Sequence, residues 1–158
     1  MKLLHGMSGL TDLPAGAVMS IGNFDGVHRG HTEILNRSRA LADSQSSVAV
    51  VTFEPHPLTA LRPRHAPPRL TSIQTKRHLL AQAGVEYLIE LPPTPEVLGV
   101  SAEQFWQILQ DQVRPSHLVE GNSFSFGQGG KGNISLLQQW SANTNVQVHV
   151  VDAVEATL

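Results

Sequence analysis

The ten residues 22–31, GNFDGVHRGH, contain three glycines and two histidines and follow directly on an apolar run. That run, 17–21, is short, apolar and ended by glycine, which predicts a strand. Apolar residues at helical spacing predict a helix over about 32–43, and the β-branched run 47–53 predicts a strand buried on both faces. Strand, helix and strand in under forty residues indicate a βαβ unit with two parallel strands.

The same alternation continues along the rest of the chain. Ser72 is a candidate N-cap, and Ser101 with Gln104 predicts a capping box. The further expected elements are helices over 72–83, 101–113 and 134–140, and strands over 85–91, 117–120 and 146–151. Five strands alternating with four helices predict an α/β fold: an open, doubly wound, five-stranded parallel sheet with helices on both faces. We expect residues 1–158 to form one domain.

Composition excludes several function classes. Lys plus Arg number 11 and Asp plus Glu number 13, a formal charge of −2, so there is no basic excess of the kind that nucleic-acid binders carry. The absence of cysteine excludes disulfides and thiolate metal sites. The N-terminus is a poor signal peptide, and no apolar run approaches the roughly 18 residues of a membrane span. We therefore expect a cytoplasmic protein with no membrane or nucleic-acid partner; the sequence does not indicate its oligomeric state.

Three polar segments follow predicted strands, at 22–31, 53–57 and 121–132. Ligands of doubly wound sheets bind outside the carboxyl ends of the strands, so these segments are expected to form one site. Gly22 and Gly26 allow a sharp turn, and Gly30 allows an anion to approach the backbone at the start of a helix, where free N–H groups attract it.

Two imidazoles beside that helix start, His28 and His31, can donate hydrogen bonds to phosphate oxygens and carry charge when protonated. The arrangement suits phosphoryl or nucleotidyl transfer, which depends on positioning and charge stabilisation. Two other interpretations stay open: a zinc pair completed by Asp25 or His56, and histidines that lie on the surface by chance.

The HxGH sequence at 28–31 resembles the motif of the HxGH nucleotidylyltransferase superfamily, whose fold is Rossmann-like. The longer string GNFDGVHRGH, with VVTFEPHP at 50–57 and VEGNSFSFGQGGKGN at 119–133, resembles the FMN adenylyltransferase (FAD synthetase) module of the prokaryotic bifunctional riboflavin kinase/FAD synthetases. The resemblance covers about residues 15–151. It implies that the FMN phosphate attacks the α-phosphorus of ATP, assisted by Mg²⁺, and that FAD and pyrophosphate leave.

The resemblance also implies roles for individual residues. The catalytic residues would be His28, His31 and Asn122. Those expected to bind ATP are Gly22, Asn23, Phe24, Asp25, His28, Gly30 and His31. Those expected to bind FMN are Phe53, Pro55, His56, Asn122, Phe124, Phe126 and Lys131. No resident metal site is implied beyond the Mg²⁺ that accompanies ATP.

Each assignment competes with a structural one. Phe53 and Phe124 would serve equally as core residues, and residues 55–57 as a rigid turn. Asp25 would serve as a local cap, and the loop 127–132 as flexible linkage. That loop lacks the GK[ST] ending of a P-loop.

Members of the resembled family carry a further Ser/Thr-rich motif with an arginine, close to SSTRIR, and a riboflavin kinase domain. The chain ends at Leu158 before either, so we expect it to be truncated. Two other functions therefore remain open: a nucleotide- or flavin-binding module without turnover, and a nucleotidylyltransferase for another small phosphorylated acceptor.

Overall fold

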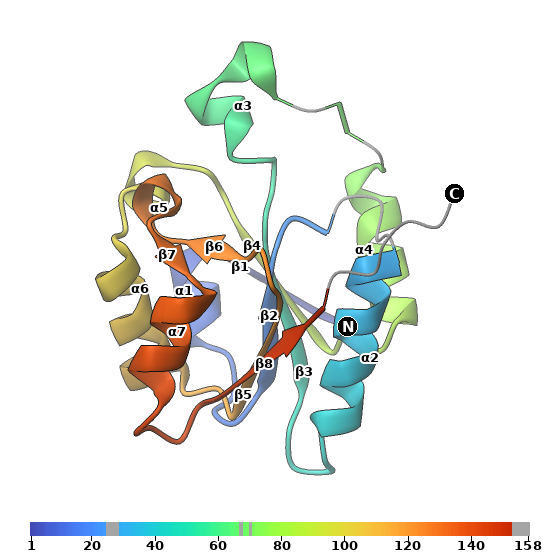
Figure 1. Cartoon of the computed structure of the whole chain (residues 1–158). Coiled ribbons are helices and arrows are strands. Elements are labelled where there is room, and N and C mark those ends of the chain that lie inside the picture. The colour runs from blue at the N-terminus through green and yellow to red at the C-terminus, as the bar shows by residue number, and fades with distance from the viewer. Residues whose placement is uncertain (25–28, 67, 70, 153–158) are drawn as a thin grey trace.

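The computed structural model describes residues 1–24, 29–66, 68–69 and 71–152. Within them, six strands form one parallel sheet in the order β1-β4-β3-β2-β5-β8 (Figure 1). The strands are β1 (Lys2–His5), β2 (Val18–Ile21), β3 (Val48–Phe53), β4 (Tyr87–Leu91), β5 (His117–Gly121) and β8 (Gln147–Val151). The parallel, doubly wound α/β architecture expected from the sequence is confirmed.

The prediction of five strands is corrected to six. The additional strand, β1, has four residues and lies at the sheet edge, where it pairs with β4 from Lys2↔Tyr87 to His5↔Glu90. Helix α1 (Gly6–Thr11) follows it and was also not predicted. Both elements are too short to show a clear period, and β1 owes its backbone partners to a strand distant in sequence.

The helices cover both faces of the sheet (Figure 1). Helices α2 and α4 pack on one face, around Leu35, Leu80 and the β3 residue Val50. Helices α1, α6 and α7 pack on the other, around Leu10, Trp106 and Leu137. Their bounds are α2 (Arg29–Leu41), α4 (Ile73–Gln82), α6 (Ala102–Ile108) and α7 (Ile134–Ser141). A π-helical turn, η3 (Leu109–Val113), continues α6, so the expected helix 101–113 is present in two geometries.

The predicted caps are confirmed. The Ser101 side chain accepts from the Gln104 N–H at 3.1 Å, and the Gln104 side chain accepts from the Ser101 N–H at 2.9 Å. The Ser72 hydroxyl accepts from the Thr75 N–H at 3.1 Å. These bonds satisfy N–H groups that have no partner inside the helix.

The two long loops contain short elements of their own. The proline-rich loop after β3 contains α3 (Leu58–Leu61) and the 3₁₀ turn η2 (Pro63–His65), and α5 (Pro95–Leu98) follows β4. The glycine-rich loop contains the antiparallel pair β6 (Ser125–Phe126) and β7 (Gly132–Asn133), with the turn η4 (Gln128–Gly130) between them. Among the described residues, no helix is both long and apolar enough to cross a membrane.

The strand order reverses direction at β2. From β2 the chain moves outward through β3 to β4, and then crosses back so that β5 pairs with the other side of β2. The β2–β5 pairing extends only over Val18↔His117 and Met19↔Leu118. The two strands therefore separate toward their carboxyl ends, and such a reversal point is where ligands of doubly wound sheets bind.

Candidate functional site

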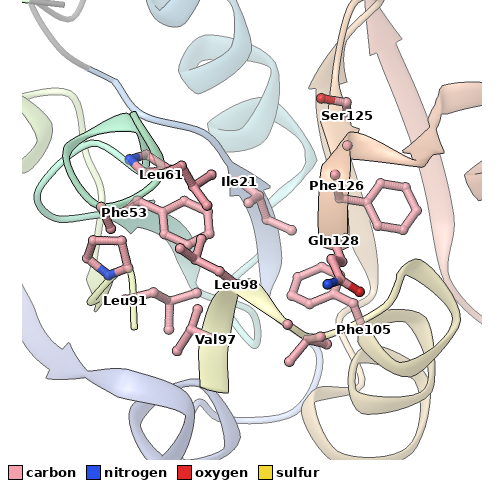
Figure 2. A pocket seen from close by; sticks show the side chains of 18 of the residues that line it. Ile21, Phe53, Leu61, Leu91, Val97, Leu98, Phe105, Ser125, Phe126 and Gln128 are labelled. Carbon is pink, nitrogen blue, oxygen red and sulfur yellow. The ribbon is translucent and has the colours of Figure 1, made fainter. Parts of the chain in front are cut away.

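A cavity of about 990 Å³ opens at the carboxyl edge of the sheet. Three strands reach it through Ile21, Phe53 and Leu91, and further side chains come from α3, α5, α6 and the β6–β7 loop (Figure 2). The labelled side chains of Figure 2 are mostly aliphatic or aromatic. The size and the apolar lining of the cavity suit a large planar organic group.

Aromatic rings form the wall on the β6 side. Phe124 stacks on Phe126 at 5.6 Å between ring centroids, with an interplanar angle of 17°. Phe126 is 7 % exposed and also contacts Phe105 at 5.9 Å and Trp140 at 6.2 Å. Phe126 is thus a core residue whose packing orients its neighbours, and both it and Phe124 line the cavity. Phe124, for which a core role was the alternative, is half-buried against the core and also borders the cavity.

Two glycines of the β6–β7 loop are required by close packing. Gly127 has φ +77°, and a Cβ there would lie 2.5 Å from the backbone nitrogen of Ala102. A Cβ on Gly132 would lie 2.7 Å from the ring of Phe126. These contacts argue against the alternative that the loop is only flexible linkage, because each glycine lets the loop approach α6 or the aromatic wall.

The turn after β2, residues 22–24, borders the same cavity with Gly22 and Asn23. The Gly22 N–H donates to the Val51 carbonyl at 2.9 Å, and the Asn23 carbonyl accepts from the Thr52 hydroxyl at 2.9 Å. Phe24 has φ +54° and is 1 % exposed, so its side chain lies in the core. Its ring packs against His31 with 4.6 Å between centroids and supports that imidazole from the protein interior.

Gly30 and His31 lie in the first turn of α2, a helix of 13 residues. The N-terminus of such a helix carries a partial positive charge, which attracts anions. Asp25 and His28 lie outside the described residues, so of the two histidines the structure places only His31.

Four of the predicted FMN residues are not among those that line the cavity: Pro55, His56, Asn122 and Lys131. His56 accepts a hydrogen bond from the Leu58 N–H at its Nδ1, at 3.0 Å, which supports the turn assignment for residues 55–57. The neighbouring Pro57 does line the cavity. Asn122 and Lys131 are exposed.

Two candidate ligands of the zinc interpretation, Asp25 and His28, lie outside the described residues. The His56 Nδ1 already accepts a backbone hydrogen bond. Among residues 1–24, 29–66, 68–69 and 71–152, no group of three or more His, Asp or Glu side chains is arranged to hold a metal ion.

Sequence reasoning missed most of the apolar wall: Leu61, Leu91, Val97, Leu98 and Phe105. Pro92 and Pro93 follow β4 at the same end of the sheet as the three polar segments. That placement was the one signal in the sequence that residues after β4 could contribute to the site. The side chains themselves carry no polar motif, so only the fold identifies them.

Sequence reasoning also missed Glu120, at the end of β5. Its side chain is 2 % exposed, and its Oε1 accepts from the Ile21 N–H at 2.7 Å. It therefore bridges the separated ends of β5 and β2. Burial raises the pKa of Glu120 well above its usual value and outweighs the hydrogen bond from Ile21, which lowers it. The site favours the neutral carboxyl.

A partly buried polar cluster adjoins the turn on the α4 side. Lys76 donates to the Thr52 hydroxyl at 2.7 Å and to Glu54 at 3.4 Å, and both oxygens of Glu54 accept from Arg69. Burial raises the pKa of Glu54, but the hydrogen bond from Arg69 and the charges of Lys76 and Arg69 outweigh it and hold that pKa below its usual value. Glu54 therefore stays ionised.

Comparisons with known proteins identify the family of the chain. The sequence profile of the FAD synthetase family matches residues 11–157. A bifunctional riboflavin kinase/FMN adenylyltransferase of Escherichia coli K12 is 37 % identical over 142 residues, which cover 88 % of the chain and 45 % of the relative. A FAD synthetase of Listeria monocytogenes is 34 % identical over 140 residues, covering 88 % of the chain and 57 % of the relative.

A solved structure with a different description supports the fold alone. A protein of Streptococcus pneumoniae described as a macrolide-efflux protein aligns with a TM-score of 0.80 at 22 % identity, over 98 % of the chain and 51 % of that protein. The chain spans about half the length of the curated relatives it matches. On the family profile and these identities, the chain belongs to the FAD synthetase family.

Proposed function

We propose that the chain transfers AMP from ATP to FMN, giving FAD and pyrophosphate, as the N-terminal module of a bifunctional riboflavin kinase/FAD synthetase. The observation that carries this proposal is the apolar cavity, which lies beside the glycine-rich turn at the reversal point of the sheet. The apolar cavity matches a ligand with a flat apolar ring, and the glycine-rich turn matches a ligand with a phosphate chain.

In this proposal the isoalloxazine ring of FMN occupies the cavity. Phe53, Phe124 and Phe105 line it, and stacking against aromatic rings favours a flat conjugated ligand. The flavin phosphate then faces the turn at 22–24, which borders the same cavity.

ATP places its phosphates at the N-terminus of α2. Backbone N–H groups of this helix start, together with His31 and His28, are proposed to donate to the phosphate oxygens, and Gly30 presents no side chain to obstruct the approach. Phe24 holds the ring of His31 in place from the core side.

The reaction needs no nucleophilic side chain. An oxygen of the FMN phosphate attacks the α-phosphorus of ATP, the new P–O bond forms, and the bond to the β-phosphate oxygen breaks so that pyrophosphate leaves. The residues at the start of α2 act by positioning both phosphates and by stabilising the charge that develops on the phosphate oxygens.

Mg²⁺ enters as the complex with ATP. Mg²⁺ takes most of its ligands from phosphate oxygens and water and needs only one or two protein carboxylates.

The direct test is incubation of the chain with ATP, FMN and Mg²⁺, followed by chromatographic detection of FAD and pyrophosphate. We expect both products in equal amounts. Parallel reactions with CTP as donor, or with phosphopantetheine as acceptor, test the alternative nucleotidylyltransferase. Binding of ATP and FMN without FAD would instead support a binding module without turnover.

A further inference from the structure

The clearest unassigned feature is a buried ammonium group next to the site. Lys76 lies on α4 and is 3 % exposed, although lysine is almost never fully buried unless it is paired. Its Nζ donates to the Thr52 hydroxyl at 2.7 Å, and Thr52 is itself fully buried at the end of β3.

The direction of these hydrogen bonds follows from the chemistry of the groups. An ammonium only donates, so the Thr52 oxygen is the acceptor from Lys76. The single hydroxyl hydrogen of Thr52 then goes to the Asn23 carbonyl, at 2.9 Å, which is nearer than the Phe53 carbonyl at 3.4 Å. A chain of donors therefore runs from Lys76 through Thr52 to the backbone of the turn.

The end of this hydrogen-bond chain at the Asn23 carbonyl fixes the orientation of the next peptide unit. The only cis peptide among the described residues is Glu54–Pro55, so the peptide between Asn23 and Phe24 is trans. In a planar trans peptide the C=O and N–H point in opposite directions. With the Asn23 carbonyl held toward Thr52 on β3, the Phe24 N–H points away from β3. The point where β5 separates from β2 lies on that other side of β2.

The same hydrogen bonds also polarise the Asn23–Phe24 peptide. A carbonyl that accepts a hydrogen bond from a hydroxyl, itself bonded to an ammonium, makes the N–H of the same peptide a stronger donor. Glu54 and Arg69 keep Lys76 in place from the other side, because the Glu54 carboxylate accepts from both cations.

We propose that Lys76 and Thr52 are positioning residues that orient the Asn23–Phe24 peptide so that its N–H donates to a phosphate oxygen of ATP. This inference rests on the proposed function for the identity of the nucleotide. It assigns a role to two residues that line neither the cavity nor the start of α2.

The test compares Thr52→Val, which keeps the side-chain shape and removes the hydroxyl, with Thr52→Ser, which keeps the hydroxyl. Lys76→Met removes the ammonium, and Lys2→Met, on the exposed edge strand β1, is the matched control for loss of a lysine charge. Calorimetry gives the affinity for Mg-ATP, flavin fluorescence gives the affinity for FMN, and thermal unfolding gives stability.

We expect Thr52→Val and Lys76→Met to weaken Mg-ATP binding about tenfold, the usual scale for one hydrogen bond to a charged group, with FMN affinity changed less than twofold. Thr52→Ser and Lys2→Met should stay within about twofold of the wild-type affinity for both ligands, which on that same scale means that no such hydrogen bond is lost. A merely structural role predicts that ATP and FMN affinities fall together with the melting temperature.

Three results overturn the inference: unchanged ATP affinity in Thr52→Val, equal loss in Thr52→Ser, or parallel loss of both ligands. Failure of the proposed function is a separate result, namely no FAD from the wild-type chain. If that chain binds Mg-ATP without forming FAD, the comparison of variants still decides the inference. Absence of Mg-ATP binding by the wild-type chain overturns both.

Discussion

Glu120 connects two strands that have separated, and it does so through a side chain instead of the backbone. The Ile21 N–H, which would otherwise lack a strand partner on that side, donates to its carboxyl at 2.7 Å. The energetic consequence depends on pH, because burial favours the protonated form of Glu120 in the folded protein only.

Glu120→Gln is therefore expected to change the pH dependence of stability. Burial raises the pKa of Glu120 in the folded state above its usual value of 4.5, so the stability that its proton provides is present below pH 4.5 and is lost as pH rises through the folded pKa. Glutamine does not titrate. Above pH 4.5, the free energy of unfolding of the variant should rise relative to that of the wild type. The difference should grow by up to about 1.4 kcal/mol per pH unit. Urea unfolding from pH 4 to pH 9 measures the difference, and parallel curves would contradict it.

Gly127 shows a second kind of residue-scale constraint, since it combines positive φ with close backbone packing against Ala102. Gly127→Ala is expected to destabilise the fold by about 1–3 kcal/mol, because the new Cβ would lie 2.5 Å from a backbone atom at the start of α6. Gly129→Ala is a matched control: it has a similar φ of +66° with no atom within 4 Å of the new Cβ. Equal decreases in melting temperature in the two variants would contradict the assignment of the loss to the clash with Ala102.

At the scale of elements, α3 is a short helix that borders the cavity and carries an exposed leucine. It has four residues, none of them buried, and its Leu61 is 60 % exposed while also lining the cavity. In Figure 1 it stands apart from the helices that cover the sheet. An exposed leucine at the mouth of an apolar cavity gains contact when a ligand enters.

Leu61→Ser is expected to weaken FMN binding about fivefold, since a half-buried leucine is worth roughly 1 kcal/mol of apolar burial. Stability without ligand should change little, because the side chain is mostly exposed in the free protein. Flavin fluorescence titration with parallel thermal unfolding measures both quantities. Unchanged FMN affinity would exclude α3 from the flavin site.

At the scale of the whole molecule, the cavity and the start of α2 lie at one edge of a sheet whose two faces pack separate cores. The cavity adjoins the core of α1, α6 and α7, whereas the start of α2 belongs to the other layer. Ligands that bind only the folded chain stabilise all of it through this shared edge.

FMN and Mg-ATP should therefore each raise the unfolding temperature. At a concentration one hundred times its dissociation constant, either ligand is expected to add about 2.7 kcal/mol to the free energy of unfolding, a shift of roughly 5–10 °C for a chain of this size. Differential scanning fluorimetry measures the shift, with adenosine as the control that lacks phosphates. A shift with adenosine equal to that with Mg-ATP would argue against phosphate recognition at α2.

Much of the fold was predictable because its signals are local. The strand at 17–21, the helix that begins at the Ser101 capping box and the chain reversal that begins at Gly22 depend on residues within a few positions of one another. Phe53, Phe124 and Phe126 were predicted for the site and line the cavity. Pro55, His56, Asn122 and Lys131 were predicted from a motif and do not line it, because a motif does not specify where each side chain points.

The amino-acid sequence by itself determined the alternation of strands and helices, the glycine-rich turn and the family, since periodicity, capping and motif are properties of neighbouring residues. Only the tertiary structure decided that β1 joins the sheet and that Leu61 and Phe105 face one cavity. It also decided that Glu120 contacts the end of β2 and that Lys76 contacts the turn after β2 through Thr52. These contacts join residues distant in the chain. Their free energy comes from burial and from hydrogen bonds away from water, and no local pattern encodes that pairing.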